Sequence, residues 1–207
     1  MISRMKKGFG SYEVLTVCVM LLIIVVVALA YVFKTNYKEK YDVMEYNARM
    51  FSLTVSNLYM QEGTQNVYYL QEVIDQRLSS DIKNPFQGDK YCDPLSSKVE
   101  IVDDKKLVTL ECGNYMVYQQ DSLKSPYTIY QVGTWSTNKK DENNQTSVFY
   151  NYVENGESLF EEDLEESIFL YEFNKENGTS YTSISELPNQ DNIVQTTMYR
   201  HMEKVSD

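Results

Sequence analysis

Few residues in this chain have the type and spacing needed for enzymatic chemistry. Its 207 residues include a single histidine, His201, so neither a histidine-based triad nor a histidine-rich metal site can be assembled. No glycine-rich phosphate loop is present. Carboxylate pairs among 30 acidic residues arise by chance and indicate no acid–base site. We therefore expect no catalytic residue, no metal site and no cofactor, and we expect that the protein is not an enzyme.

Two of the three cysteines are candidates for a disulfide. Cys92 precedes the strand-like segment SKVEIV and Cys112 ends the segment KLVTLEC, so a hairpin would bring them together. An exported location permits oxidation, and a bridge closing a loop of this size would add about 3 kcal/mol of stability. Two free thiols are the alternative if the cell does not oxidise exported proteins. Cys18 lies in an apolar run, where we expect it to act as a small hydrophobic residue.

Glu13 is also chemically notable, because it directly precedes the longest apolar run. Residues 14–33 carry no charge, and as a helix they would be about 30 Å long, which matches the hydrocarbon thickness of a bilayer. A carboxylate at the edge of the span can reach the headgroups, whereas one packed among spans would need a cationic partner. The preceding basic residues, Arg4, Lys6 and Lys7, predict a cytoplasmic N-terminus and export of the chain from residue 34 onward.

Three interpretations of this leader compete. Ala28-Leu29-Ala30 fits the small-x-small pattern of a secretory cleavage site, although the apolar run continues beyond it to Phe33. A plain uncleaved signal anchor is the second. The third rests on Gly8-Phe9, followed four residues later by Glu13 and then by the apolar run. With the basic residues before it, this spacing resembles the leader of type IV pilins and of the pseudopilins of type II secretion systems.

That resemblance implies a role for each motif residue. A prepilin peptidase would cut between Gly8 and Phe9, and the new N-terminus at Phe9 would be N-methylated. Glu13 would pair with the Phe9 amine of a neighbouring subunit and fix the offset between subunits. The implied partners are the prepilin peptidase, the membrane and other pilin or pseudopilin subunits contacted through the N-terminal helix. The protein would be a single-pass cell-membrane protein with its C-terminal domain outside the cytoplasm, and it would then enter a cell-surface or periplasmic filament.

The apolar run continues into an amphipathic helix. No proline or glycine interrupts residues 11–62, which predicts one helix of about 50 residues ending near Gly63. Its outer part carries one apolar face with alternating steps of four and three, made of Tyr37, Tyr41, Met44, Ala48, Phe51, Val55 and Leu58. Such a stripe could be a coiled-coil seam, whereas the pilin resemblance implies that it packs on a sheet.

The remaining chain predicts an α+β fold with a pilin-like antiparallel sheet. We expect a second helix over residues 67–78, a break at 84–88, and strands in SKVEIV, KLVTLEC and NYMVYQQ. Further strands in PYTIYQVGTW and TSVFYNYV, a helix over 160–177 capped by Gly178 and a final strand in NIVQTTMYRHM follow. The expected parts are a leader (1–8), a transmembrane and assembly helix (9–33), an outer helix with the pilin-like sheet (34–120) and a C-terminal strand-helix extension (121–207).

The charge of the chain limits its partners. Removing residues 1–8 takes away three of the 19 basic residues and none of the 30 acids, which lowers the net charge from −11 to −14. Such a surface repels phosphate backbones, so nucleic acid is not favoured as a partner. Two hypotheses of function remain: a structural filament subunit, or alternatively a minor tip-type pilin or membrane-anchored extracytoplasmic binding protein that uses the enlarged C-terminal half.

Overall fold

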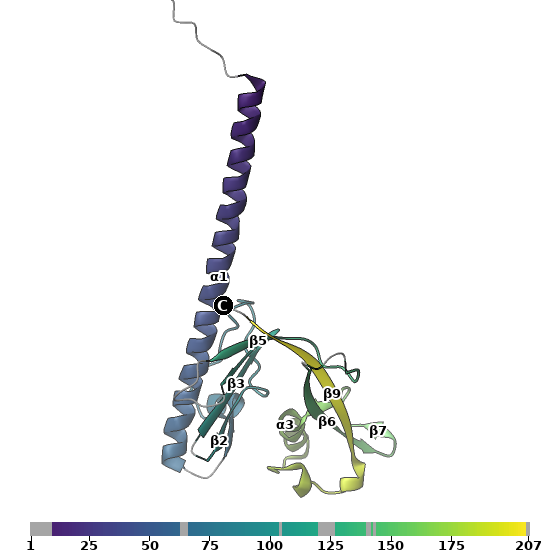
Figure 1. The fold of residues 1–207 in the computed structure, drawn as a ribbon. Coiled ribbons are helices and arrows are strands. Elements are labelled where there is room, and N and C mark those ends of the chain that lie inside the picture. The colour runs from purple at the N-terminus through teal and green to yellow at the C-terminus, as the bar shows by residue number, and fades with distance from the viewer. Residues whose placement is uncertain are drawn as a thin grey trace, which may run out of the picture. The chain divides into compact units, whose positions relative to one another are not determined.

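The computed structural model describes residues 10–62, 66–103, 105–119, 127–139, 142 and 144–205. The contacts within the chain divide it into two units, Met1–Asp42 and Val43–Asp207. The division falls inside α1, a helix of 52 residues that runs without interruption from Ser11 to Glu62 (Figure 1). The prediction of one helix across residues 11–62 is therefore confirmed.

The part of α1 that belongs to the first unit is apolar and exposed. Between Val14 and Phe33 every described side chain is open to solvent, and the large ones are valine, leucine, isoleucine, methionine, tyrosine and phenylalanine. A helix that is apolar on all sides and remains unburied is typical of a membrane span. By its length and composition, α1 can cross a membrane.

The second unit contains a nine-stranded antiparallel sheet. The strands follow the order β1-β2-β3-β4-β5-β9-β6-β7, and β8 also pairs with β6. Their bounds are β1 Val67–Tyr69, β2 Lys98–Val102, β3 Lys105–Cys112, β4 Tyr115–Gln119, β5 Thr128–Val132, β6 Asn144–Glu154, β7 Glu157–Ser158, β8 Leu164–Glu165 and β9 Ile193–Lys204. Consecutive strands β1 to β5 pair with their neighbours in the chain, and short turns join β2 to β3 and β3 to β4, whereas α2 and a loop lie between β1 and β2.

The last strand joins the two parts of the sheet. The end of β9, Met202–Lys204, pairs with β5. The rest of β9 pairs with β6 over a long register that runs from Ile193 opposite Tyr152 to His201 opposite Asn144. Because β5 and β6 do not pair with each other in the described chain, β9 is the strand through which the sheet continues past β5.

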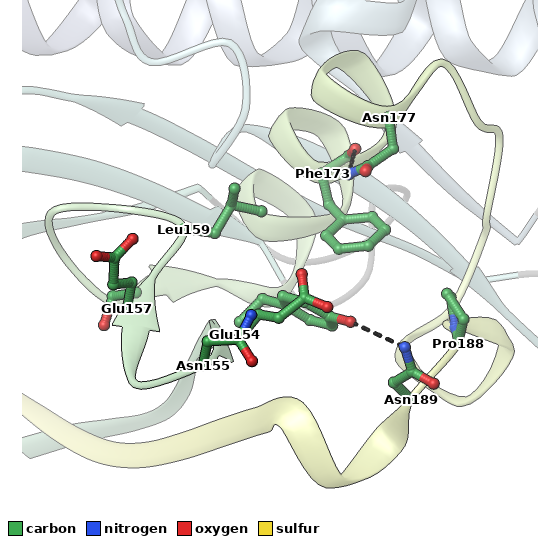
Figure 2. A pocket seen from close by; sticks show the side chains of 10 residues that line it. Glu154, Asn155, Glu157, Leu159, Phe173, Asn177, Pro188 and Asn189 are labelled. Carbon is green, nitrogen blue, oxygen red and sulfur yellow. Dashed lines mark hydrogen bonds between the residues drawn. The ribbon is translucent and has the colours of Figure 1, made fainter.

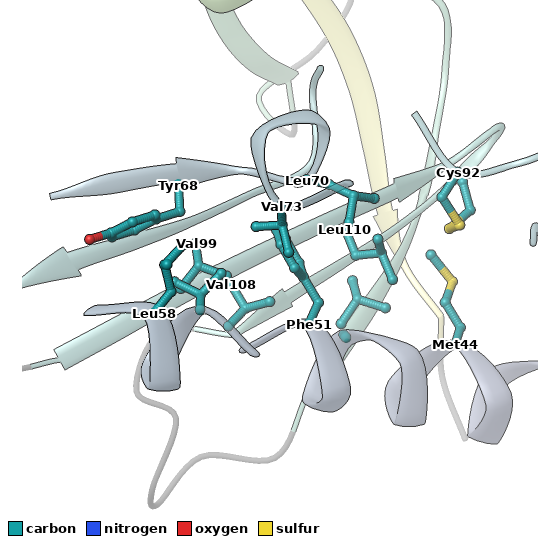
Figure 3. Packing of buried hydrophobic residues seen from close by; sticks show 14 of the residues in the cluster. Met44, Phe51, Leu58, Tyr68, Leu70, Val73, Cys92, Val99, Val108 and Leu110 are labelled. Carbon is teal, nitrogen blue, oxygen red and sulfur yellow. A yellow bond between two sulfur atoms is a disulfide. The ribbon is translucent and has the colours of Figure 1, made fainter. Parts of the chain in front are cut away.

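A first core lies between the outer part of α1 and the strands β1 to β4. Met44, Phe51 and Leu58 point from one face of α1 toward the sheet (Figure 3). The first core consists of Met44, Ala48, Phe51, Val55, Leu58, Tyr68, Leu70, Val73, Cys92, Val99, Ile101, Val108, Leu110, Cys112 and Val117. The predicted apolar face of α1 is thus buried from Met44 to Leu58 against the sheet of its own chain and is not a coiled-coil seam there.

A second core lies under β6 and α3 (Glu166–Asn177). Its buried members are Tyr152, Phe169, Phe173 and Leu187. The rings of Phe169 and Phe173 lie 5.9 Å apart, and those of Tyr152 and Phe173 lie 5.3 Å apart, both in tilted arrangements. This core is therefore mainly aromatic, in contrast to the aliphatic first core.

Two predicted helices are shorter in the structure because neighbouring strands use part of their sequence. The segment expected as a helix over 67–78 begins as β1, and only Leu70–Asp75 is helical, as α2. The helix expected from residue 160 begins at Glu166, since Leu164–Glu165 pairs with β6. Its predicted cap is correct: Gly178 ends α3 in a left-handed conformation with φ 64°.

Candidate functional site

The outer part of α1 carries a second apolar stripe that the sheet does not cover. This stripe consists of Val43, Tyr46, Met50, Leu53 and Met60. The first four are spaced three or four residues apart, and Met60 follows seven residues after Leu53. Their side chains are exposed, from 44% for Met50 to 76% for Met60. A helix that packs on a sheet through one face normally carries polar residues on the other. We call these five residues the exposed stripe.

The predicted leader residues fall at or beyond the beginning of the described chain. Gly8 and Phe9 lie outside the described residues. Glu13 lies in the first turn of α1, as the third residue of the helix. The cleavage, methylation and assembly roles of these residues stay predictions.

The predicted disulfide is present between Cys92 and Cys112. Both residues belong to the first core, and Cys112 ends β3. The bridge connects the loop that contains Cys92 to the sheet beneath it, 20 residues further along the chain. Cys18 is a free thiol on the exposed surface of α1. The bridge therefore has a structural place, at the core that holds the outer part of α1.

A buried ion pair joins β9 to β3. Arg200 donates two hydrogen bonds to the Glu111 carboxylate, at 2.9 Å from Nη1 and 2.5 Å from Nη2. Its Nε donates to Gln145 at 2.7 Å, and its guanidinium lies 4.5 Å from the centre of the Trp135 ring. The Arg200 side chain is 4% exposed and that of Glu111 is 14% exposed. A two-bonded, water-excluded arginine–carboxylate pair fixes geometry as well as charge.

A second carboxylate, Glu165, lies beside this pair at the beginning of α3. Its burial, and then the nearby Glu111 and Asp93 carboxylates, raise the pKa of Glu165 from its usual value to about 7, although the Arg200 and Lys98 cations oppose this shift. Such an environment favours the protonated carboxyl over a wider pH range than in an exposed glutamate, up to about neutral pH. Arg200, Glu111 and Glu165 come from β9, β3 and β8, which are separated by long stretches of sequence, so no local motif could have predicted this cluster.

A groove of about 560 Å³ lies beside the second core. Tyr152 and Phe173 lie at its base, and Leu159 and Pro188 provide further apolar walls. Its polar lining consists of Glu154, Asn155, Glu157, Ser158, Asn177 and Asn189. Figure 2 shows Glu154 and Phe173 turned toward the middle of the groove, whereas Glu157 lies on its outer side. The groove could not be predicted from the sequence, because its walls come from β6, β7, α3 and the loop before β9.

Comparison with known proteins identifies no similar protein. No family model, no curated protein and no solved structure matches this chain. The features from which a function can be proposed are therefore those of the chain itself, namely the helix α1 with its exposed stripe and the groove beside the second core.

Proposed function

We propose that the protein is a structural subunit, a pilin or pseudopilin, of a type IV pilus-like or type II secretion-like filament. The observation that carries this proposal is the exposed stripe on α1. It lies on the same helix as the exposed apolar residues 14–33, beyond the mostly polar residues 34–42, along the part of the helix whose opposite face is already buried. A long helix that carries uncovered apolar residues in its N-terminal part and again from Val43 to Met60 is suited to lateral packing against other helices.

The leader supplies the rest of the proposed assembly. Cleavage after Gly8 would remove the basic residues and leave the amine of Phe9 as the new terminus. Glu13 would form an ion pair with this amine of a neighbouring subunit, since a carboxylate packed between apolar helices needs a partner. The position of Glu13 in the first turn of α1 agrees with this role, because the first turn of a helix also favours a negative charge.

Cleavage and assembly can be tested with two separate variants. Gly8→Val should block the peptidase, so that Arg4, Lys6 and Lys7 stay attached and a heavier membrane-bound form accumulates. Glu13→Val should still be cleaved but should fail to enter filaments, because the amine of Phe9 would lose its partner at a cost of about 3 kcal/mol per subunit contact. Each variant is expressed with its native machinery, the mature N-terminus is sequenced, and sheared surface filaments are quantified.

The wild-type chain provides the decisive control. A mature N-terminus at Phe9 supports the proposal. A mature N-terminus at Tyr31 would identify Ala28-Leu29-Ala30 as a secretory cleavage site, and an intact terminus at Met1 would identify an uncleaved anchor; either result contradicts it. Normal filaments from Glu13→Val would contradict the assembly role of this residue.

The groove supports a second candidate function, that of a minor tip-type subunit or membrane-anchored binding protein. A structural subunit has no need for a groove of about 560 Å³ with a carboxylate turned into it. The position of the protein distinguishes the two functions. Immunogold labelling of purified filaments should mark their whole length for a main structural subunit and only one end for a tip subunit, whereas no labelling would favour the membrane-anchored binding protein.

A further inference from the structure

The polar atoms of the groove are mostly hydrogen-bond acceptors. The amide nitrogen of Asn177 donates to the Phe173 carbonyl oxygen at 2.8 Å. The amide nitrogen of Asn189 donates to the Tyr152 hydroxyl at 3.4 Å. Each amide keeps its carbonyl oxygen as an acceptor, together with its second N–H. The carboxylates of Glu154 and Glu157 are acceptors only.

The charge of the lining is negative. Among the described residues that line the groove, two are glutamates and none is basic. These two glutamates stand directly opposite each other in the register of β6 and β7. Like charges in such a pair repel each other, so a cation bound beside Glu154, the one that is turned into the groove (Figure 2), would relieve part of a cost that the hairpin otherwise bears. A phosphate or carboxylate ligand would meet only repulsion here.

We propose that this groove binds a lysine side chain presented by an extended peptide segment of another protein. An ammonium group is positively charged and carries three donors and no acceptor, which complements the lining. The exposed side chain of Leu159 and the ring of Pro188 offer apolar contact to the methylene stem of a lysine. The binding site does not depend on how α1 assembles.

Two observations favour a peptide over a free amine. A volume of about 560 Å³ is larger than one side chain needs and falls within the range of sites that hold whole small ligands. In addition, Glu157 and Ser158 of β7 line the groove, and β7 is the last strand on the sheet path. The end strand of a sheet is where an extended peptide can add through its backbone.

The test measures peptide binding to the full chain in non-ionic detergent micelles. The probe is the acetylated and amidated peptide Ala-Ala-Lys-Ala-Ala, followed by saturation-transfer NMR. Two matched peptides replace the lysine by norleucine, which keeps the stem without the charge, or by glutamate. We expect the lysine peptide to bind about tenfold more tightly than the norleucine peptide and the glutamate peptide to show no binding.

The hairpin offers a matched pair of variants. Glu154 and Glu157 are both exposed, and removing either charge relieves the same cross-strand repulsion. Only Glu154 is turned into the groove (Figure 2). We expect Glu154→Gln to weaken binding of the lysine peptide about tenfold and Glu157→Gln to change it less than about twofold.

Three results would overturn the proposal. The first is no binding of the lysine peptide to the wild-type chain. The second is equal loss of binding in Glu154→Gln and Glu157→Gln, which would indicate a diffuse charge effect. The third is displacement of the peptide by free cadaverine at equal concentration, which would assign the groove to a small diamine. Each of these results concerns the groove alone and leaves the outcome of the leader cleavage and filament tests unchanged.

Discussion

The two cores of the second unit are held together by different means. The first core is aliphatic, contains the Cys92–Cys112 bridge and covers one face of α1. The second core is mainly aromatic and depends on side-chain amides. Asn151 accepts hydrogen bonds from the backbone of Tyr152 and Phe160, and Asn174 bonds the backbone of Tyr181 in both directions. The first core thus serves to hold a helix, whereas the second shapes loops around a groove.

This difference has a consequence for how the protein unfolds. We expect the first core to be stable by itself, because short turns connect β2, β3 and β4 and a disulfide crosslinks it. The second core is small, and among the described strands its sheet continues from the first core through β9. The Arg200–Glu111 pair adds a second connection, between β9 and β3. The variants below measure how far each core depends on the other.

The largest effect is expected at the contact between α1 and the sheet. Phe51 is 2% exposed in the first core, so Phe51→Ala should cost about 4 kcal/mol of the free energy of unfolding through lost burial and the cavity left behind. The control is Leu53→Ala, two residues away on the exposed stripe, which should cost less than about 0.5 kcal/mol. Thermal unfolding of the full chain in micelles, followed by circular dichroism, checks both. Similar losses in the two variants would contradict the packing of α1.

The next effect concerns the connection between the cores. Arg200→Met removes the cation and leaves the Glu111 carboxylate without its partner in a mostly buried position. We expect a loss of about 3 kcal/mol, and much of it should return in the double variant with Glu111→Leu. Trp135, the only tryptophan, packs against Arg200 and reports the change through its fluorescence. If the double variant is no more stable than Arg200→Met, the ion pair is not the source of the loss.

The sequence predicted the first core far better than the second. The alternating positions Val99, Ile101, Val108 and Leu110 identified the hairpin of β2 and β3, and the helical periodicity of α1 identified its buried face. These signals are local. The second core was predicted only as separate elements, because its arrangement depends on pairs such as Arg200 with Glu111, which are 89 residues apart. No periodicity in the sequence reports such a pair, and the groove depends on the same long-range arrangement.

A smaller effect is expected from pH at Glu165. Burial and the neighbouring carboxylates raise its pKa to about 7 in the folded chain, whereas the unfolded value is about 4.3. Between these values the folded chain holds a proton that the unfolded chain has lost, so stability should fall as pH rises through this window. We expect a loss of about 2 kcal/mol, less than for a fully buried carboxyl because Glu165 is partly open to solvent.

The variant Glu165→Gln should remove this part of the pH dependence. Glutamine keeps the shape and cannot ionise, so the difference in stability between pH 5 and pH 8 should shrink by about the same amount. The control is Glu162→Gln, an exposed residue three positions earlier. Denaturant unfolding of each variant at the two pH values measures the change. An unchanged pH dependence in Glu165→Gln would show that other groups carry it.

The smallest effect is expected at the end of α3. Gly178 has a φ of 64° and open space where a Cβ would stand, so Gly178→Ala introduces backbone strain alone and should cost about 1 kcal/mol. Gly178→Asn should cost less, since asparagine tolerates this conformation. Gly88→Ala is the matched control on the side of the first core, because it also has open space and lacks the positive φ, and we expect it to be neutral.

The same thermal unfolding experiments also show whether the two cores unfold together. If β9 and the Arg200–Glu111 pair couple the two cores, Gly178→Ala lowers the midpoint of a single unfolding transition. If the second core unfolds alone, Gly178→Ala shifts only the transition seen by Trp135 fluorescence, and Phe51→Ala leaves that transition unchanged.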